Sequence, residues 1–397
     1  MGLSMNHDVI VLGGNHQNPL GVIEALGQKG INPYVIINDK NKSSFVLKSK
    51  YIKQGWICST EAEIINCLQE VISHQSSKSV VIACNDNMAS FLSDHYNQFR
   101  DFLLLPGIPN QGELTAWMDK ERMTEAASKI GLTVPKSWIV QKDAIPQDVI
   151  YPCVTKSLTS VNNGKSEFTI CENRKELEDF INNQAHSSTI QVQQFIDKEF
   201  EFQYMGCSLN GGETIIIPGR THIETTLHFN NITFLKYQAD KIINDPLTLT
   251  KAEEFIRQTG YSGLFSVEFM HGKDGKDYFL EMNFRNDGNG IVVTAAGTNL
   301  PYIWYLYNCG GDYISEIEKS EVKDTYSVPE DSYFISMLQG DLSFCEWRKN
   351  MRKVNCYLTY FKGGGNTKPF WALMWLQKRV ILSSIAICIL KKLHLRK

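Results

Sequence analysis

The amino-acid sequence predicts an α/β and α+β fold, in which an open α/β domain at the N-terminus precedes a larger region of mixed strands and helices. Two patterns lead to this prediction. In residues 7–106, short apolar strands alternate with helical segments, which is typical of a parallel sheet covered by helices. In residues 189–196, 199–204, 265–269 and 279–285, apolar and polar side chains largely alternate with a period of two, which is typical of antiparallel strands with one buried face. At 397 residues the chain is long enough for two or three domains.

The first elements form a strand, a helix and a second strand. Residues 7–14 predict a buried strand, Asn18 and Pro19 predict the N-cap and first residue of a helix, and Gly30 ends that helix. A further helix and strand follow in residues 61–84. The first turn lacks the Gly-x-Gly-x-x-Gly spacing of dinucleotide sites, so we favour a structural role for its glycines. A nicotinamide-dependent enzyme that uses this domain remains an alternative.

A later helix has a cation in its first turn. Asp119 can cap this helix and Gly131 can end it. Lys120 then lies at the positive end of the helix dipole, where a cation is unfavourable unless an anion is near. Lys120 is therefore a candidate anion ligand, and a merely solvated lysine is the alternative.

Two segments have the composition of nucleotide-contacting loops. Strands at residues 151–156 and 167–171 flank the polar loop 157–165, which either covers phosphates or forms an exposed hairpin tip. The strand at residues 189–196 breaks at residues 197–198. Such a break exposes backbone groups that can bind the edge of a flat heterocycle, and a carboxylate nearby can bind ribose.

The hairpin of residues 263–285 is the most informative segment. Asp274 and Gly275 predict a two-residue type I′ turn, which places Glu268 directly opposite Glu281. Like charges so placed destabilise a ladder, so we expect a cation between them. The same turn pairs Lys273 with Lys276 and Met270 with Phe279, and the predicted core face holds Phe265, Val267, Phe269, Leu280, Met282 and Phe284.

Asn283 and Arg285 follow Glu281 on the same face of the second strand, because side chains alternate with period two. Two carboxylates, an amide oxygen and a guanidinium suit Mg²⁺ held against phosphate. A surface hairpin with a solvated polar face is the alternative.

The C-terminal tail differs in charge from the rest of the chain. Residues 347–397 contain twelve Lys or Arg and no Asp or Glu, although the whole chain has a net charge of −3. The mostly apolar run at residues 380–390 is shorter than the roughly 20 residues that span a bilayer. Tryptophans and cations around it predict either a helix at an anionic membrane surface or a helix docked on the body of the protein. The apolar content disfavours nucleic acid as a partner.

In chain order, these features resemble the ATP-grasp superfamily over roughly residues 111–297, and the hairpin is similar to the metal-binding end of biotin carboxylases and carbamoyl phosphate synthases. The resemblance implies a Rossmann-like N-terminal domain followed by an ATP-grasp fold with a small lid subdomain. The implied domains are a Rossmann-like domain at 1–110, an ATP-grasp domain at 111–310 with its lid at about 135–195, and a C-terminal extension at 311–397.

By this resemblance, Glu268, Glu281 and Asn283 would hold one or two Mg²⁺ or Mn²⁺ ions, and Arg285 would face the transferred phosphoryl group. The implied ATP ligands are Lys120 and Lys156 at the phosphates, Gly164 in the lid loop, the segment from Gln193 to Ile196 at adenine, and Glu199 at ribose. The chain departs from the family in its lid, which has one glycine, and in Gln193 and Gln194, where a glutamate is usual. Glu201 is an alternative ribose ligand, and Arg220 is a possible further phosphate or carboxylate ligand.

The resemblance implies an ATP-dependent, ADP-forming ligase that activates a carboxylate as an acyl phosphate for attack by an amine or a thiol. A loose likeness to D-aspartate ligases, together with the tail, suggests an amino-acid ligase acting on a cell-wall or surface-polysaccharide precursor. The alternative is an ATP-binding module without turnover. No Cys-x-x-Cys pair and no signal peptide are visible, so we expect a cytoplasmic protein, at the inner face of the membrane if the tail binds there. A homodimer is a further possibility.

Overall fold

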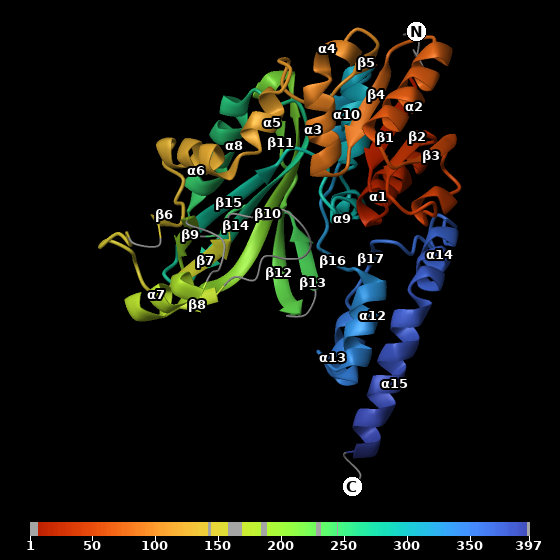
Figure 1. The fold of residues 1–397 in the computed structure, drawn as a ribbon. Coiled ribbons are helices and arrows are strands. Elements are labelled where there is room, and N and C mark those ends of the chain that lie inside the picture. The colour runs from red at the N-terminus through yellow and green to blue at the C-terminus, as the bar shows by residue number, and fades with distance from the viewer. Residues whose placement is uncertain are drawn as a thin grey trace.

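The computed structural model describes residues 7–141, 144–157, 169–183, 189–227, 232–243 and 245–394. Three parts are visible in Figure 1: an N-terminal α/β part, a central part built on antiparallel sheets, and C-terminal helices that project away from both. Within the described residues, no helix is both long and apolar enough to cross a bilayer.

The N-terminal part is a parallel five-stranded sheet in the order β3-β2-β1-β4-β5. Both faces are buried: Ile10 and Leu12 belong to one core cluster, and Val9 and Val11 to the other. This part comprises β1 (Val9–Gly13), α1 (Gln17–Gly27), β2 (Tyr34–Asn38), β3 (Gln54–Cys58), α2 (Glu61–His74), β4 (Ser79–Ala83), α3 (Asp86–Asp94), α4 (Tyr96–Phe99), β5 (Leu103–Leu104) and a short 3₁₀ turn (Val46–Lys48). The predicted alternation of strands and helices is confirmed.

The predicted N-cap of α1 is wrong by two residues. His16 caps the helix, and its side chain accepts a hydrogen bond from the backbone of Asn18. Asn18 is buried and has a long-range partner instead: its side-chain nitrogen donates to the carbonyl of Asn286, at 2.6 Å. Local sequence does not show that the side chain of Asn18 is used in a distant contact rather than as a helix cap.

The central part contains a sheet in the order β11-β10-β14-β15, whose buried face packs on α6 and α8. Its elements are α5 (Glu113–Trp117), α6 (Lys120–Lys129), β10 (Lys198–Leu209), a 3₁₀ turn (Asn210–Gly212), β11 (Thr214–Ile216), α8 (Pro246–Thr259), β14 (Gly263–Gly272) and β15 (Asp277–Asn283). A smaller sheet, β6-β9-β7-β8, stands beside it with β6 (Ser137–Gln141), β7 (Cys153–Ser157), β8 (Thr169–Cys171), α7 (Arg174–Asn183) and β9 (Thr189–Gln194).

The turn between β14 and β15 differs from the prediction. The backbones of Gly272 and Lys276 pair, which leaves a three-residue loop at 273–275, and within this described loop only Gly275 has positive φ, at 78°. A type I′ turn needs positive φ at both central residues, and Asp274 does not adopt it. The three-residue loop shifts the pairing by one, so Met270 lies opposite Tyr278 rather than Phe279.

A β-bulge then restores the predicted pairing of the carboxylates. Phe269 pairs with Phe279, Glu268 pairs with Glu281, and Leu280 between them has no partner across the ladder. The predicted core position of Leu280 is therefore wrong, because Phe279 is buried in its place. The other five predicted core residues of the hairpin are buried, namely Phe265, Val267, Phe269, Met282 and Phe284.

The C-terminal part joins the central part through a third sheet, β12-β13-β16-β17. Its strands are β12 (Arg220–Leu227), β13 (Ile232–Gln238), β16 (Thr325–Val328) and β17 (Cys356–Tyr357), and its helices are α9 (Ile291–Ala296), α10 (Leu300–Asn308), α11 (Tyr313–Glu318), α12 (Glu330–Gln339), α13 (Phe344–Met351), α14 (Lys368–Leu376) and α15 (Lys378–His394). Helices α9 and α10 pack against the N-terminal sheet. In Figure 1, α15 runs beside α12 and points away from the N-terminal part.

Candidate functional site

The polar face of the β10-β14-β15 sheet carries a row of side chains that can bind ligands. Gln203, Glu268 and Glu281 lie in register across the three strands. Ser266 and Asn283 form the neighbouring pair on the same face, two residues along each strand. The two predicted carboxylates therefore stand directly opposite each other, as the sequence indicated.

Hydrogen bonds connect the predicted residues into a chain. The amide nitrogen of Asn283 donates to Oε1 of Glu268 at 2.9 Å and to Oγ of Ser266 at 3.2 Å. Arg285 donates from Nη2 to Oδ1 of Asn283 at 3.0 Å and from Nε to Oδ1 of Asp86 at 3.0 Å. Arg285 thus joins the hairpin to the N-terminal part of the chain.

Lys120 completes this group, which we call the hairpin cluster: Lys120, Glu268, Glu281, Asn283 and Arg285. Asp119 caps α6 as predicted, and Lys120 in the first turn forms an ion pair with Oε2 of Glu281 at 2.9 Å. Burial opposes the charge of Lys120, but attraction by Glu281 and more distant carboxylates outweighs it, so the pKa of Lys120 is raised. The anionic partner expected for this lysine is, in the described chain, a carboxylate of the hairpin.

The environment of Glu268 disfavours a negative charge on its carboxyl group. Burial and then repulsion from Asp287 and Glu281 raise the pKa of the Glu268 carboxyl to about 8, although Arg285 and Asn283 act in the opposite direction. Burial disfavours the charge of Arg285 too, but Asp287, Asp86 and Glu268 outweigh it and raise its pKa, so Arg285 remains a cation. A carboxylate that is hard to ionise beside a second carboxylate is stabilised by an added cation.

The donor set fits a hard divalent cation. Glu268 and Glu281 offer oxygen atoms, which Mg²⁺ and Mn²⁺ prefer, whereas the oxygen of Asn283 accepts from Arg285 and its nitrogen donates to Glu268. In the described chain, no group of three or more His, Cys, Asp or Glu side chains is arranged as a metal site. The predicted set contains two carboxylates and one amide, so it does not form such a group.

Three further residues at this site were not predicted. Asp287 is buried, accepts a hydrogen bond from Ser266 at 3.0 Å and lies 3.6 Å from Arg285. The sequence could have indicated Asp287, because it continues the every-second-residue spacing of Glu281, Asn283 and Arg285. Asp86 and His16 follow the carboxyl ends of β4 and β1, and only the fold brings them here. Burial, and then the charge of Arg285, lower the pKa of His16 to about 4.

The predicted ATP ligands are spread over the two sheets of the central part. Lys156 lies on β7, Gln193 on β9 donates to Oγ of Ser137 at 3.3 Å, and Ile196 lies in the connection from β9 to β10. Gly164 and the rest of the lid loop lie outside the described residues. Glu199 sits at an irregularity of β10, whereas Glu201 lies on the same face as Gln203 and bonds Lys198 at 2.6 Å.

Within the described residues, Arg220 forms no hydrogen bond or ion pair with the hairpin cluster. It begins β12, is buried, and its Nε and Nη1 atoms have no hydrogen-bond partner there. Burial lowers its pKa, and the charges that act on it belong to Asp240, Tyr204 and Asp277. These neighbours differ from those of Glu268 and Glu281.

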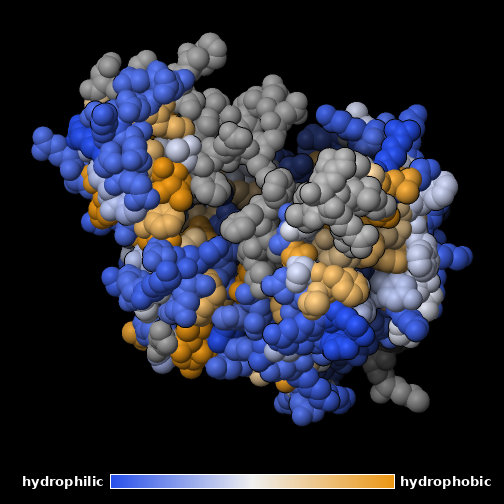
Figure 2. All heavy atoms as spheres, turned by 90° about the horizontal axis from the view of Figure 1, so that it is seen from below, coloured by the Kyte–Doolittle hydropathy of each residue, from blue (hydrophilic) through white to orange (hydrophobic). Residues whose placement is uncertain are grey.

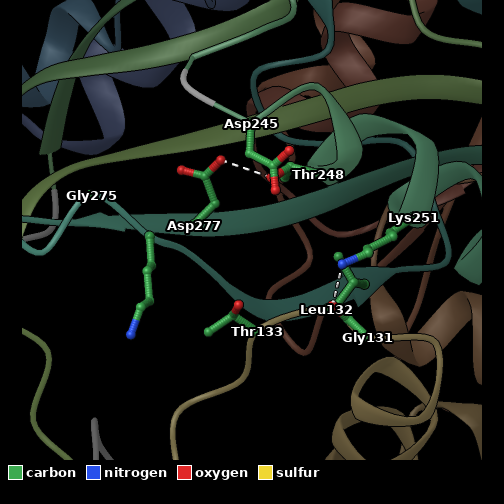
Figure 3. Close-up of a pocket in the computed structure, with 9 residues that line it drawn as sticks. Gly131, Leu132, Thr133, Asp245, Thr248, Lys251, Gly275 and Asp277 are labelled. Atoms are coloured by element: carbon green, nitrogen blue, oxygen red, sulfur yellow. Dashed lines mark hydrogen bonds between the residues drawn. The ribbon is translucent and has the colours of Figure 1, made fainter.

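A small pocket lies on another side of the hairpin, between its tip, α8 and the end of α6 (Figure 3). Its polar groups already have partners. Asp277 bonds His271 at 2.6 Å and accepts from Thr248 at 2.9 Å, and Lys251 donates to the carbonyl of Gly131 at 2.7 Å. The Thr248 contact joins the hairpin to α8, and the Lys251 contact joins α8 to the turn after α6, so we assign this pocket a structural role.

The chain combines an N-terminal open α/β part with a following part of antiparallel sheets, and charged side chains gather on the hairpin where the two parts meet. This combination defines a class of two-part α/β and α+β proteins. In a sequence comparison, residues 125–300 match the model of the ATP-grasp domain. The predicted fold, a Rossmann-like domain followed by an ATP-grasp fold, is confirmed.

Individual relatives are remote. A formate-dependent phosphoribosylglycinamide formyltransferase of Bacteroides fragilis is 25% identical over 209 residues, which are 49% of this chain and 51% of the relative. This chain therefore spans about half the length of that relative. Phosphoribosylglycinamide synthetase from Anaerococcus prevotii has a TM-score of 0.60 at 16% identity, covering 81% of this chain and 80% of its own. L-amino acid ligase from Bacillus licheniformis has a TM-score of 0.59 at 16% identity, covering 80% and 77%. At such identities the structural likeness shows the fold alone.

Proposed function

We propose that this protein is an ATP-dependent, ADP-forming ligase, which activates a carboxylate as an acyl phosphate for attack by an amine. The observation that carries the proposal is the pairing of Glu268 with Glu281 beside Asn283, Arg285 and Lys120 on an ATP-grasp hairpin. This group combines oxygen donors for a cation with two cations for phosphate. A thiol acceptor in place of the amine is equally compatible with the cluster.

The chain's own residues would act electrostatically. Lys120 and Arg285 stay protonated at neutral pH, because nearby carboxylates raise the pKa of each, and both would neutralise phosphate oxygens. Glu268, Glu281 and Asn283 would hold one or two Mg²⁺ or Mn²⁺ ions, which supply charge neutralisation for the triphosphate. Asn283, fixed between Arg285 and Glu268, would orient both neighbours.

ATP itself would lie between the two sheets of the central part. Lys156 and Gly164 would contact its phosphates, and the segment from Gln193 to Ile196 its adenine. Either Glu199 or Glu201 would bind the ribose, and the strand register favours Glu201, which shares a face with Glu268.

The finer parts of the proposal concern substrates and assembly. We propose a small carboxylate and an amine-bearing acceptor as substrates, with a cell-wall or surface-polysaccharide precursor as one candidate acceptor. A cytoplasmic location and a homodimer remain predictions, and Arg220 remains a candidate phosphate or carboxylate ligand.

The test is ADP release in the presence of Mg²⁺, screened across amino acids and acidic sugars. We expect Glu281→Gln to reduce turnover at least about 100-fold, because it removes one charge from the cation site. Glu254→Gln is the matched control, since Glu254 is an exposed carboxylate on α8, and it should leave turnover unchanged. Unchanged turnover in Glu281→Gln would contradict the metal assignment.

The second candidate is an ATP-binding module without turnover, which is motivated by the single glycine of the lid loop. Such a module binds ATP with Mg²⁺ and yet releases no ADP with any carboxylate. Binding measured by calorimetry, together with the absence of ADP across the full screen, would support it over the ligase.

A further inference from the structure

The two C-terminal helices expose large apolar side chains to solvent. Trp371, Trp375 and Leu376 on α14 have exposed fractions of 61%, 68% and 48%, and on α15 the values for Val380 and Leu382 are 47% and 65%. Figure 2 shows the molecule from below, the side toward which α15 points in Figure 1, and hydrophobic residues are visible there among hydrophilic ones. Contiguous exposed apolar side chains mark an interaction surface more often than scattered ones do.

Residues 378–386 of helix α15 expose most of their apolar side chains and bury a polar one. Ser384 is buried and accepts a hydrogen bond from Gln339 of α12 at 3.3 Å, and Gln377, just before the helix, donates to Asp331 of α12 at 2.9 Å. An ordinary surface helix buries its apolar residues and exposes its polar ones. This helix therefore suits a surrounding that is less polar than water.

The charge of this region selects the kind of partner. Residues 347–397 contain twelve Lys or Arg and no Asp or Glu. Lys378 lies over the ring of Trp375, with its Nζ 3.7 Å from the ring centroid, so a cation and an aromatic ring are presented together. Tryptophan and basic residues side by side are typical of helices at the boundary between lipid headgroups and acyl chains.

We propose that α14 and α15 bind an anionic lipid surface, with Trp371 and Trp375 inserted at the headgroup level and the basic side chains facing the phosphates. A second copy of this chain is a poorer occupant, because it would present the same positive charge to its partner. No described helix can cross a bilayer, so the binding is peripheral. This inference goes beyond the ligase proposal and does not depend on it.

The experiment is co-sedimentation of the full chain with vesicles of phosphatidylcholine alone and with vesicles that contain phosphatidylglycerol. We expect binding only to the anionic vesicles, and a loss of binding as salt is raised. Equal binding to both kinds of vesicle, or no binding to the anionic ones at low salt, would overturn the proposal.

Variants locate the surface. Trp371→Glu combined with Trp375→Glu should weaken binding by about tenfold or more, and Lys378→Glu combined with Arg379→Glu by about thirtyfold. Ile314→Glu is the matched control, because Ile314 on α11 is 56% exposed and lies outside the tail, and it should bind like the wild type. Light scattering tests whether a second copy of the chain occupies this surface. If the wild type is a dimer, the tryptophan variant is a monomer and neither binds vesicles, the surface serves self-association instead.

Discussion

At the scale of single residues, Glu268 has the least favourable environment in the site. Its carboxyl group is partly buried, faces a second carboxylate and has a pKa raised to about 8. An ordinary carboxyl group ionises well below neutral pH, so at pH 7 to 9 the ligand-free protein either keeps a proton there or bears a repulsive charge. Residues that bind a cation strongly often destabilise the protein when that cation is absent.

The first prediction is that Glu268→Gln stabilises the ligand-free protein while it abolishes turnover. Because the pKa of Glu268 is raised from its usual 4.5 to about 8 in the folded state, this carboxyl group costs no stability at low pH, and the cost builds up as pH rises from about 4.5 to about 8. The gain from the substitution should therefore be about 1 kcal/mol at pH 5 and grow to several kcal/mol, on the order of 5, at pH 9. Denaturant unfolding without metal at the two pH values measures it, and an equal effect at both would contradict the assigned cause.

The second prediction concerns Lys120, which pairs with Glu281 in the ligand-free chain. Lys120→Met removes a cation that we assign to ATP phosphates, so the KM for ATP should rise by about tenfold or more. Lys129→Met, at an exposed lysine on the last turn of the same helix, is the control and should not change KM. A fall in kcat with an unchanged KM would show instead that Lys120 acts only in the transition state.

At the scale of elements, the hairpin shows what sequence patterns do and do not fix. Alternation predicted its two faces, and the pairing of Glu268 with Glu281 came out as predicted. The predicted two-residue turn was wrong, because the two strands are joined by a three-residue loop and the pairing is restored by a bulge at Leu280. Turn length and bulges depend on small differences in backbone energy, which alternating apolar residues do not encode.

The third prediction tests the observed loop. Gly275 has a φ of 78°, and a Cβ added there would meet no atom within 4 Å, so only backbone strain opposes a side chain. Gly275→Ala should cost about 1 kcal/mol of stability, and Gly275→Asn should cost less, because Asn tolerates this conformation. Thermal unfolding of both variants measures the difference, and equal costs would argue against a left-handed residue at this position.

At the scale of the whole molecule, the site exists because two distant parts of the chain meet. The backbone of Asn286 donates to the carbonyl of Ala83 at the end of β4, and its side chain pairs with Asn18 of α1. This contact carries Arg285 to Asp86. Local sequence could predict the hairpin residues, which lie on neighbouring strands, but not Asp86 or His16, whose place depends on how the parts pack. The domain division at residues 110 and 310 remains a prediction.

The last prediction separates the proposed nucleotide from the nicotinamide alternative. If ATP with Mg²⁺ binds only the folded chain, as proposed, it should stabilise the protein by roughly 2.7 kcal/mol at about 100 times its Kd, and NAD should have no effect. Glu281→Gln should lose most of the stabilisation that depends on Mg²⁺ but little of that from ATP alone, because we propose other residues for the adenine and ribose contacts. Thermal shifts of both proteins with ATP, ATP plus Mg²⁺, and NAD measure this. If NAD but not ATP stabilises the protein, we would conclude that the nucleotide site lies on the N-terminal sheet and that the hairpin cluster has no part in the mechanism.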